Sequence, residues 1–480
     1  MHKELLYGKL IIIAVCAGVI FLLCAFDSAG YASHAYVRVN GQDIAVYQDG
    51  GKRYLFLPSY AEQQNLIIND QIRELQPQVL QSSGLPALFI STRSGNLDAV
   101  YADKYYKESG KISAYSENGE LLYSGGLHYI KGRGNYTWMT GEWTKKPFSI
   151  EIDKNVRLLD QSAGGKFALI ANASDDTLAR NDLARLLQEE LGMPYAGRGT
   201  FTDLYINGEY MGLYYLCATP DIGEDRIGLM TYAGDITGGY LIERELPDRL
   251  AIRLSREKET NQRETDYVET DMGELLVIHR PQYVTEEEKQ YLSDYLNKVE
   301  DAIAGNYAYA ELIDPDTFAI MYLTEEIIKN YDAGVTSAFY YKVSDRDGGR
   351  LYAAPGWDYD FSLNNYLDWM EFNDPAEMSG LTHHVHACFW YEALCKSDDF
   401  YDLVKEIYRT NREEIGNVLC GSGPEELRER LADSCRMEYF RWKAMYDGRG
   451  TVPGSGAAYG KMTDFAAERL EYLDSVWITE

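Results

Sequence analysis

Short runs of alternating apolar and polar residues dominate the first third of the chain. Between residues 35 and 57 these runs are divided by Asn-Gly and Gly-Gly pairs, the dipeptides that tight β-hairpin turns favour. Similar runs, ALFIST, KISAYS, ELLYSG and GLHYIKGRG, continue to about Ile152. The pattern predicts a small β-rich region over residues 31–84, followed by a second group of strands.

Helical spacing appears after these strands. Leucines from Leu178 to Leu191 recur at helical intervals, and Asp175 or Asp176 before them and Gly192 after them are typical helix ends. The segment DLYINGEYMGLYYL has Asn-Gly between two apolar runs, which is a strong hairpin signal. We therefore expect a helix followed by a hairpin.

The second half of the chain has a mainly helical pattern. Apolar spacing predicts a solvated helix within residues 256–310 and another helix capped by Asp316. A turn at Asp-Gly-Gly and a strand, RLYAAPGWDYDF, come next, and helices are expected from about Ala387 onward. Residues 446–480 read as a Gly/Pro-rich loop and a helix. The expected fold class is α+β, with a β-rich N-terminal half and a helical C-terminal half.

The N-terminus carries a targeting pattern. The stretch from Leu10 to Phe26 contains no charged residue and follows Lys3 and Lys9. A positive flank is typical of the end that stays in the cytoplasm, so the rest of the chain is predicted to be extracytoplasmic. The stretch is short for a membrane span and long for a signal-peptide core. Residues 1–30 are therefore interpreted as a membrane anchor or a cleaved signal peptide.

Net charge restricts the possible partners. The 480 residues include 46 basic and 75 acidic side chains, a formal net charge of −29. A field of this sign repels phosphate backbones and anionic lipids. We expect no nucleic-acid partner, and membrane contact through the N-terminal segment only. The seven cysteines include no CxxC pair, so no thiolate metal site is predicted.

One glycine loop is followed by two lysines. The loop GRGN at residues 132–135 precedes Lys145 and Lys146. Ammonium groups placed beyond a flexible glycine loop can neutralise a bound phosphate, although a solvent-facing basic turn has the same pattern. The chain has no GxxxxGK(S/T) and no HExxH, so a P-loop and a zincin site are excluded.

Three aspartates are candidates for chemistry. Asp358 and Asp360 alternate along the predicted strand GWDYDF, so their carboxylates would share one face about 7 Å apart or closer. Two such oxygen ligands suit Mg²⁺, while a solvated acidic pair is the alternative. Their spacing is a poor match for a glycosidase carboxylate pair. Asp332 follows the helix ending in IIKN and is placed to enter a cleft as a proton acceptor.

Several distinctive segments follow one another in a fixed order over roughly residues 85–445. They are IKGRGNYTW, KKPFSIEI, FALIANASDDTLARNDLARLL, DLYINGEYMGLYYL, GGYLIERE, EEIIKNYD and PGWDYDF. In content and order they resemble the spore coat protein H (CotH) kinase-like family. The resemblance implies an atypical protein-kinase-like fold that binds ATP and Mg²⁺ and phosphorylates serine or threonine of partner proteins.

The resemblance also implies roles for the aspartates. Asp332 is similar to the aspartate that accepts the proton of a substrate hydroxyl in a kinase catalytic loop. Asp358 is similar to the aspartate that binds Mg²⁺, and Asp360 would assist it.

Four further residues receive nucleotide-site roles through the resemblance. Lys145 or Lys146 is similar to the lysine that neutralises the phosphates. Arg180 and Asn181 resemble the RN motif of the family, and they would support the same site.

Two positions depart from the kinase pattern. A kinase catalytic loop carries a metal-binding Asn five residues after its base, and this chain has Ser337 there. Ala218 stands where an acidic residue is expected. Two functions are therefore considered: a kinase acting on proteins of the bacterial cell surface or spore coat, and a catalytically weak pseudokinase or binding module at the same location.

Overall fold

The computed structural model describes residues 30–478, apart from short gaps. The gaps are residues 63–66, 69–71, 73–74, 135, 140, 142–143, 155, 160, 225, 306, 334–336 and 379–387. The predicted anchor or signal peptide at residues 1–30 lies outside the described residues, except for Gly30. Among the described residues no helix is both long and apolar enough to cross a bilayer.

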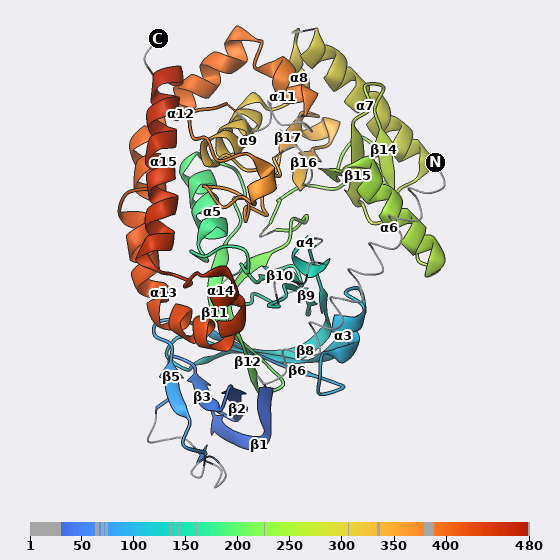
Figure 1. Cartoon of the computed structure of the whole chain (residues 1–480). Helices are drawn as coiled ribbons and strands as arrows, with labels where there is room; N and C mark the ends of the chain where they lie inside the picture. Colours follow the sequence, from blue (N-terminus) through green and yellow to red (C-terminus); the bar gives the residue numbers. More distant parts are fainter. Residues whose placement is uncertain are drawn as a thin grey trace, which may run out of the picture.

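The N-terminal part is a five-stranded sheet with strand order β4-β1-β2-β3-β5 (Figure 1). Its strands are β1 (Gly30–Val39), β2 (Gln42–Asp49), β3 (Lys52–Leu57), β4 (Ile67–Ile68) and β5 (Gln78–Gln81). The two predicted hairpins are confirmed as the antiparallel pairs β1–β2 and β2–β3. Val37, Ile44 and Phe56 pack against Phe89 and Tyr205 of the neighbouring barrel. The sheet is therefore attached to the barrel by an apolar face.

Seven strands form a closed barrel in the order β10-β12-β11-β6-β7-β8-β9. They are β6 (Ala87–Thr92), β7 (Glu108–Tyr115), β8 (Leu121–Gly132), β9 (Phe148–Glu151), β10 (Lys166–Ile170), β11 (Gly199–Ile206) and β12 (Glu209–Ala218). Alternate residues such as Ile130, Phe148, Ile150 and Leu169 fill the interior. The predicted Asn-Gly hairpin is confirmed as β11–β12. Two short helices, α3 (Asp98–Ala102) and α4 (Tyr136–Met139), flank the barrel.

A third sheet has the strand order β14-β15-β13-β16-β17. Its strands are β13 (Tyr240–Arg244), β14 (Tyr267–Glu269), β15 (Leu275–Arg280), β16 (Ala338–Lys342) and β17 (Leu351–Ala353). The single solvated helix predicted within residues 256–310 is wrong in its extent. Two helices, α6 (Pro247–Glu259) and α7 (Glu286–Ala304), flank β14 and β15. The charged residues around these short strands conceal them in the sequence pattern.

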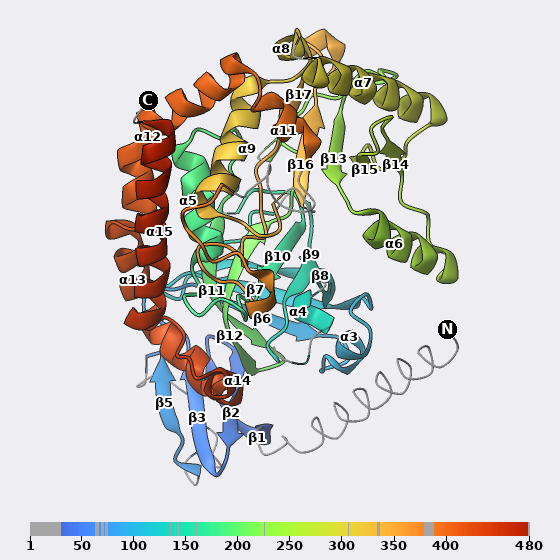
Figure 2. The same cartoon turned by 45° about the horizontal axis from the view of Figure 1, so that its top comes forward.

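Of the remaining helices, all but α5 belong to the C-terminal half of the chain (Figure 2). The remaining helices are α5 (Arg180–Glu190), α8 (Tyr309–Leu312), α9 (Pro315–Ile328), α11 (Phe389–Leu394), α12 (Asp398–Leu419), α13 (Ser422–Arg441), α14 (Lys443–Arg449) and α15 (Gly456–Trp477). All but two of the residues of α9 are buried, because α5, α12 and α15 pack around it. The expected α+β class, β-rich first and helical later, is confirmed.

Two predicted helix starts are shifted in the structure. The helix α5 begins later than expected because the Asp175 carboxylate accepts the N–H groups of Thr177 and Arg180 in a preceding turn. The helix α9 is capped by Asp314, whose carboxylate accepts the N–H of Thr317, and not by Asp316. Both differences lie within one turn, where helix ends are hardest to predict.

Candidate active site

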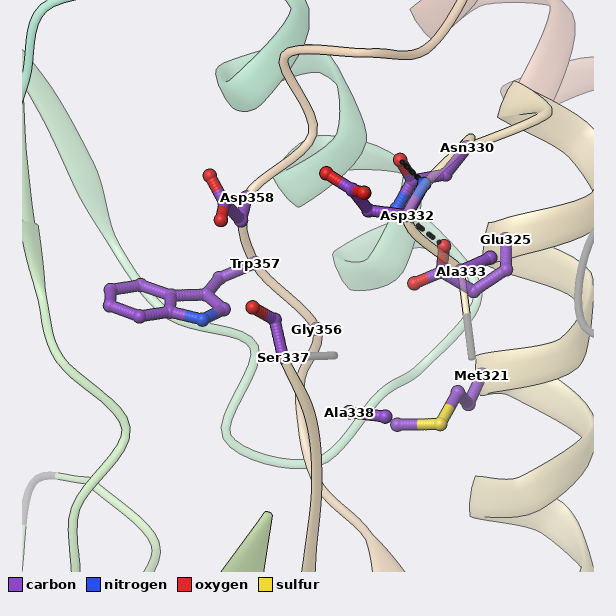
Figure 3. A pocket seen from close by; sticks show the side chains of 10 residues that line it. All are labelled: Met321, Glu325, Asn330, Asp332, Ala333, Ser337, Ala338, Gly356, Trp357 and Asp358. Carbon is purple, nitrogen blue, oxygen red and sulfur yellow. Dashed lines mark hydrogen bonds between the residues drawn. The ribbon is translucent and has the colours of Figure 1, made fainter. Parts of the chain in front are cut away.

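A cavity of about 280 Å³ lies between the barrel and the helical half of the chain. Tyr215 and Cys217, at the end of β12, line it from the barrel, and residues 355–359 line it from the loop after β17. Asp358 belongs to this cavity and also to a smaller adjoining pocket that contains Asp332 (Figure 3). Ligand sites commonly form between two parts of a chain in this way.

Asp332 lies in the loop that follows α9. Its backbone N–H donates to Asn330 Oδ1 over 3.3 Å, and the N–H of the preceding Tyr331 donates to the Phe361 carbonyl over 2.8 Å. Burial raises the pKa of Asp332 to about 6, the negative charge of Asp358 adds to this shift, and Arg249 opposes it. A carboxylate with a pKa near neutrality is suited to accept a proton from a bound group.

Asp358 and Asp360 do not lie on a strand, which corrects the sequence prediction. The strand β17 ends earlier, and both residues belong to an irregular loop in which Asp358 has a left-handed φ of 73°. Their carboxyl groups are nevertheless close enough for the charge of Asp358 to act on Asp360. Burial, together with the charges of Asp358 and Asp332, raises the pKa of Asp360 to about 8.

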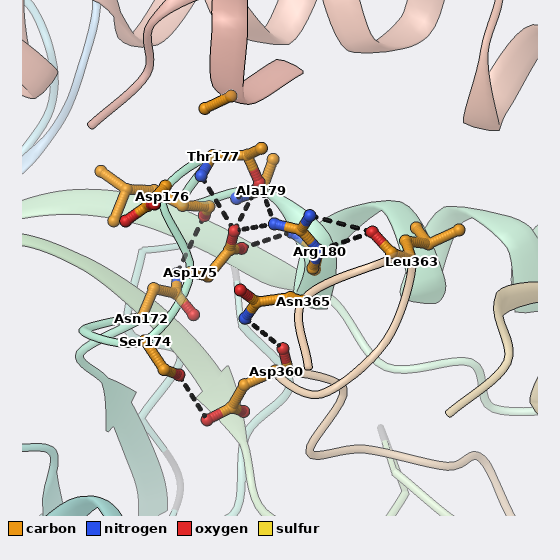
Figure 4. Close-up of polar contacts among 12 residues, drawn as sticks. Asn172, Ser174, Asp175, Asp176, Thr177, Ala179, Arg180, Asp360, Leu363 and Asn365 are labelled. Carbon is orange, nitrogen blue, oxygen red and sulfur yellow. Dashed lines mark hydrogen bonds and ion pairs between the residues drawn. The ribbon is translucent and has the colours of Figure 1, made fainter. Parts of the chain in front are cut away.

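Asp360 presents an unsatisfied oxygen to this site. Its Oδ1 is buried and has no hydrogen-bond partner among the described residues, while Oδ2 accepts a long hydrogen bond of 3.5 Å from Ser174 (Figure 4). A buried acceptor without a partner is costly, and two adjacent carboxylates repel each other when both are ionised. An oxygen-seeking divalent cation such as Mg²⁺ relieves both costs, so these two residues fit a metal site.

Arg180 and Asn181 hold the loop that carries these aspartates. Arg180 Nη2 donates to the Leu363 carbonyl over 2.9 Å, and the same guanidinium forms a buried ion pair with Asp175 (Figure 4). Asn181 Oδ1 accepts the Tyr359 N–H over 2.9 Å, and Asn181 also lines the larger cavity. The support expected from this pair therefore acts through the position of the loop.

Lys145 and Lys146 are not among the described residues that line either cavity. Lys145 is fully buried, with Nζ 2.9 Å from Glu438 Oε1 and a 2.6 Å hydrogen bond to the Leu213 carbonyl. Lys146 donates to the Trp138 carbonyl over 2.9 Å. Because Lys145 is held in the barrel and Lys146 at α4, the structure does not bring the predicted phosphate-binding lysines to the aspartates.

Lys131 and Lys166 share a sheet face with the cavity-lining Cys217, although neither lysine is among the described residues that line the cavity. In the strand register, Lys131 pairs with Ser149, Ser149 with Ala168, and Ala168 with Cys217. Directly paired residues point to the same face of a sheet, so Lys131 shares its face with Cys217, which lines the cavity. Lys166 is two residues before Ala168 on β10 and points the same way.

Arg133, two residues after Lys131, contacts the loop that carries Asp358 and Asp360. Its guanidinium lies 4.4 Å from the centre of the Trp357 ring, and Trp357 directly precedes Asp358. Lys131 has cations on several sides, including Lys166 and Arg133, and these charges, after burial, lower its pKa to about 8. The sequence prediction missed this group. The sequence pattern that could have identified these basic residues is the alternation of Lys131 and Arg133 with residues of β8 that face into the barrel.

The two positions that depart from the kinase pattern lie at the site. Ser337 lines the pocket that contains Asp332, and Ala218 lines the larger cavity. Glu243 does not take the place of an acidic residue at Ala218, because its carboxylate is 2.7 Å from His279 Nε2 in the third sheet.

Comparison with known proteins gives a family for the chain. A family described as CotH kinase protein matches residues 130–473. No curated protein matches the chain. The matched range covers most of the chain and includes the basic residues of β8 and β10 as well as all three aspartates. The chain therefore belongs to the CotH kinase protein family.

Proposed function

We propose that this protein is a Mg²⁺-dependent kinase that transfers the γ-phosphate of ATP to serine or threonine hydroxyl groups of partner proteins. One observation carries the proposal: Asp332, Asp358 and Asp360 gather beside a cavity, and the guanidinium of Arg133, directly after the barrel strand β8, contacts Trp357, which lines that cavity. Opposed cations and carboxylates suit a polyphosphate bound together with a divalent ion. Membership of the CotH kinase family supports a kinase-like activity.

Asp358 and Asp360 are the residues that would hold Mg²⁺. The unpartnered Oδ1 of Asp360 and the adjacent carboxyl of Asp358 offer oxygen ligands at one point. When bound, the ion supplies positive charge that neutralises phosphate oxygens during transfer. Its binding would also release the proton that the raised pKa of Asp360 retains near neutral pH.

The barrel face would bind the nucleotide. Lys131, Lys166 and Arg133 offer ammonium and guanidinium groups to the phosphates, and charge-assisted hydrogen bonds of this kind are strong. The end of β12, with Tyr215 and Cys217, lines the cavity with less polar surface that suits a base. This division keeps the phosphates near the aspartate loop.

Asp332 would act on the acceptor. It orients the attacking hydroxyl, whose oxygen forms a new bond to the γ-phosphorus while the bond from that phosphorus to the leaving ADP oxygen breaks. The hydroxyl proton passes to the Asp332 carboxylate. The raised pKa of Asp332, about 6, makes it a better proton acceptor than an exposed aspartate.

The proposal includes a location outside the cytoplasm. The uncharged stretch from Leu10 to Phe26 with its positive flank supports export, either with a retained anchor or by secretion. The acceptors would then be proteins of the bacterial cell surface or spore coat.

A binding module with weak or no catalysis is the second candidate. Ser337 favours it, because this residue lines the pocket of Asp332 at the position where kinases supply a second metal-binding Asn. A serine hydroxyl is a poorer Mg²⁺ ligand than a carboxylate or an amide oxygen.

Nucleotide binding and phosphate transfer should be measured on the same full-length protein. For a kinase, ATP with Mg²⁺ raises the melting temperature, and radiolabel from γ-³²P-labelled ATP enters protein serine or threonine. Asp332→Ala should keep the thermal shift and lose the transfer, while Asp464→Ala, on the exposed face of α15, should keep both. Binding without transfer supports the second candidate, and absence of both overturns both.

A further inference from the structure

We propose that Glu325 is a positioning residue that fixes two loops relative to each other. The first loop follows α9 and carries Asp332, and the second follows β17 and carries Asp358. Glu325 is on the last turns of α9 and is 7% exposed. It acts through two neighbours, one in each loop. The kinetic consequence rests on the proposed kinase function, whereas the structural consequence does not.

The contact with the first loop passes through Asn330. Glu325 Oε2 accepts a hydrogen bond of 2.8 Å from Asn330 Nδ2, and the Glu325 carbonyl accepts the Asn330 N–H over 3.1 Å (Figure 3). With its Nδ2 held by Glu325, the Asn330 amide turns Oδ1 toward the Asp332 N–H, which it accepts over 3.3 Å. Glu325 therefore sets the orientation of the amide that holds Asp332.

The contact with the second loop passes through Tyr359. The buried hydroxyl of Tyr359 lies beside the Glu325 carboxylate, close enough for the two groups to interact, and Tyr359 lies between the two proposed metal ligands. The packing here is close: a Cβ added to Gly356 would lie 2.0 Å from the Tyr359 hydroxyl and 3.3 Å from Glu325 Oε1. Only glycine leaves room for this contact.

The second loop needs such a contact because its backbone is strained. Asp358 has a φ of 73°, and for a residue other than glycine this conformation costs about 1 kcal/mol or more unless neighbours impose it. Two backbone hydrogen bonds join the loops farther along, from Tyr331 N–H to Phe361 and from Leu363 N–H to Ile328. Both lie beyond Asp360, so the Tyr359 hydroxyl supplies the contact next to Asp358.

The adjacent carboxylate on the same helix provides a contrast. Glu326 is as buried as Glu325, but it pairs with Arg469 of α15 over 2.6 Å. Glu325 has no ion pair with a cation among the described residues, and burial raises its pKa to about 7. A buried carboxyl without a cation is unfavourable for stability, which is consistent with a role in positioning the site.

Glu325→Gln and Tyr359→Phe should be compared with Glu326→Gln in the full-length protein. The glutamine side chain keeps the size of the glutamate but cannot accept from both Asn330 and Tyr359, since one oxygen is replaced by an N–H donor. Both loop variants should lower kcat about tenfold or more and leave the KM for ATP within about threefold, because misplacement by a fraction of an ångström slows transfer more than binding. Glu326→Gln should lower the melting temperature and keep kcat per folded molecule.

A double-mutant cycle tests whether the two residues act as one unit. If they do, the combined Glu325→Gln and Tyr359→Phe variant loses little more kcat than either single variant. Additive losses, or kcat unchanged in both single variants, would overturn the proposal. Tyr359→Phe retains the ring, so it keeps the test valid if the Glu325→Gln protein folds poorly.

Hydrogen exchange separates this proposal from the kinase proposal. If the wild-type protein transfers no phosphate, the proposed kinase function is wrong. The positioning role of Glu325 can still be tested by amide hydrogen exchange measured by mass spectrometry. Glu325→Gln should accelerate exchange at least about fivefold in peptides covering residues 331–333 and in those covering 357–361. Glu326→Gln should not accelerate exchange in either set of peptides. Acceleration in only one of the two loops, or in none, contradicts the role of Glu325 in joining them.

Discussion

Two regions of the molecule bury charged side chains in opposite ways. In the barrel, Lys145 and Glu438 are both fully buried and lie 2.9 Å apart. Their remaining polar groups are also satisfied: the Tyr446 hydroxyl donates to one Glu438 oxygen over 3.0 Å, and the Leu213 N–H donates to the other over 2.9 Å. This cluster joins α13 to the barrel and is closed to further ligands.

The cleft gathers charges of the same sign. Besides burial, the charge of Asp358 raises the pKa of Asp332, and the charges of Asp358 and Asp332 raise that of Asp360; none of the three aspartates forms an ion pair with a cation among the described residues. Asp360 leaves one oxygen without a partner in that part of the chain. In the barrel, the charges that lower the pKa of Lys131, after burial, are those of other cations.

The difference distinguishes charges that stabilise the fold from charges that are available to a ligand. Buried charges whose polar groups are all paired within the protein do not need a ligand for their stability. Like charges held close together lower the stability of the fold until a ligand neutralises them. On this criterion we assign Lys145 to the charges that stabilise the fold and propose Lys131 as a charge that is available to a ligand. The four predictions below test that assignment.

Asp358→Ala should have the largest effect on activity. Loss of a proposed metal ligand should reduce phosphate transfer about 1000-fold, and the melting temperature without ligand should stay equal or rise because one half-buried like charge is removed. Transfer assays and differential scanning fluorimetry measure the two quantities. A variant that keeps most of its activity, or that unfolds well below the wild type, would place Asp358 with the structural charges.

Glu438→Gln should show the opposite result. Removing one partner of the buried pair leaves Lys145 without a counter-charge and should lower the free energy of unfolding by about 3 kcal/mol, with unchanged affinity for ATP. Urea denaturation and calorimetric titration measure these values. The paired replacement Lys145→Met with Glu438→Leu should recover most of the lost stability, since no unpaired charge remains.

Lys131→Met should weaken ATP binding about tenfold, the expected loss of one charge-assisted hydrogen bond to phosphate. Lys146→Met is the matched control, because that ammonium group contacts backbone carbonyls near α4. It should leave the Kd for ATP within about twofold. An equal loss of ATP affinity in both variants would contradict a specific role of Lys131 in phosphate binding.

The pH dependence of ATP binding should show the smallest effect. Burial and neighbouring cations lower the pKa of Lys131 to about 8, so a growing fraction of this amine is neutral as the pH rises above 8. A neutral amine pairs less well with phosphate, and the Kd for ATP should rise about threefold between pH 7.5 and 9. In Lys131→Arg the guanidinium stays charged, and the Kd should stay nearly constant over this range.

Elements with local signals were predicted correctly. The leucine-rich helix α5 and the hairpin β11–β12 depend on contacts between residues close in sequence, so spacing and turn residues indicate them. The strands β14 and β15 and the closure of the barrel were missed. Strand pairing depends on partners far away in the chain, and a single-sequence pattern does not identify these partners.

The site divides in the same way. Asp332, Asp358 and Asp360 could be chosen from the sequence, because each lies in a short and distinctive segment at the end of a helix or strand. Glu325 and Lys131 could not be chosen in this way, because no local pattern distinguishes them from the other charged residues of the sequence. Their importance depends on which face of α9 or β8 turns toward the cleft.

Residue type, spacing and turn chemistry are properties of neighbouring residues, and they were sufficient for the fold class, the family resemblance and the three aspartates. The environment of a charge is set by segments that are distant in sequence. Glu438, almost three hundred residues after Lys145, decides that this lysine is paired and buried. The barrel register decides that Lys131 shares a sheet face with Cys217, which lines the cavity. Burial and pairing change the free energy of a charge by several kcal/mol, so its role follows from the folded chain.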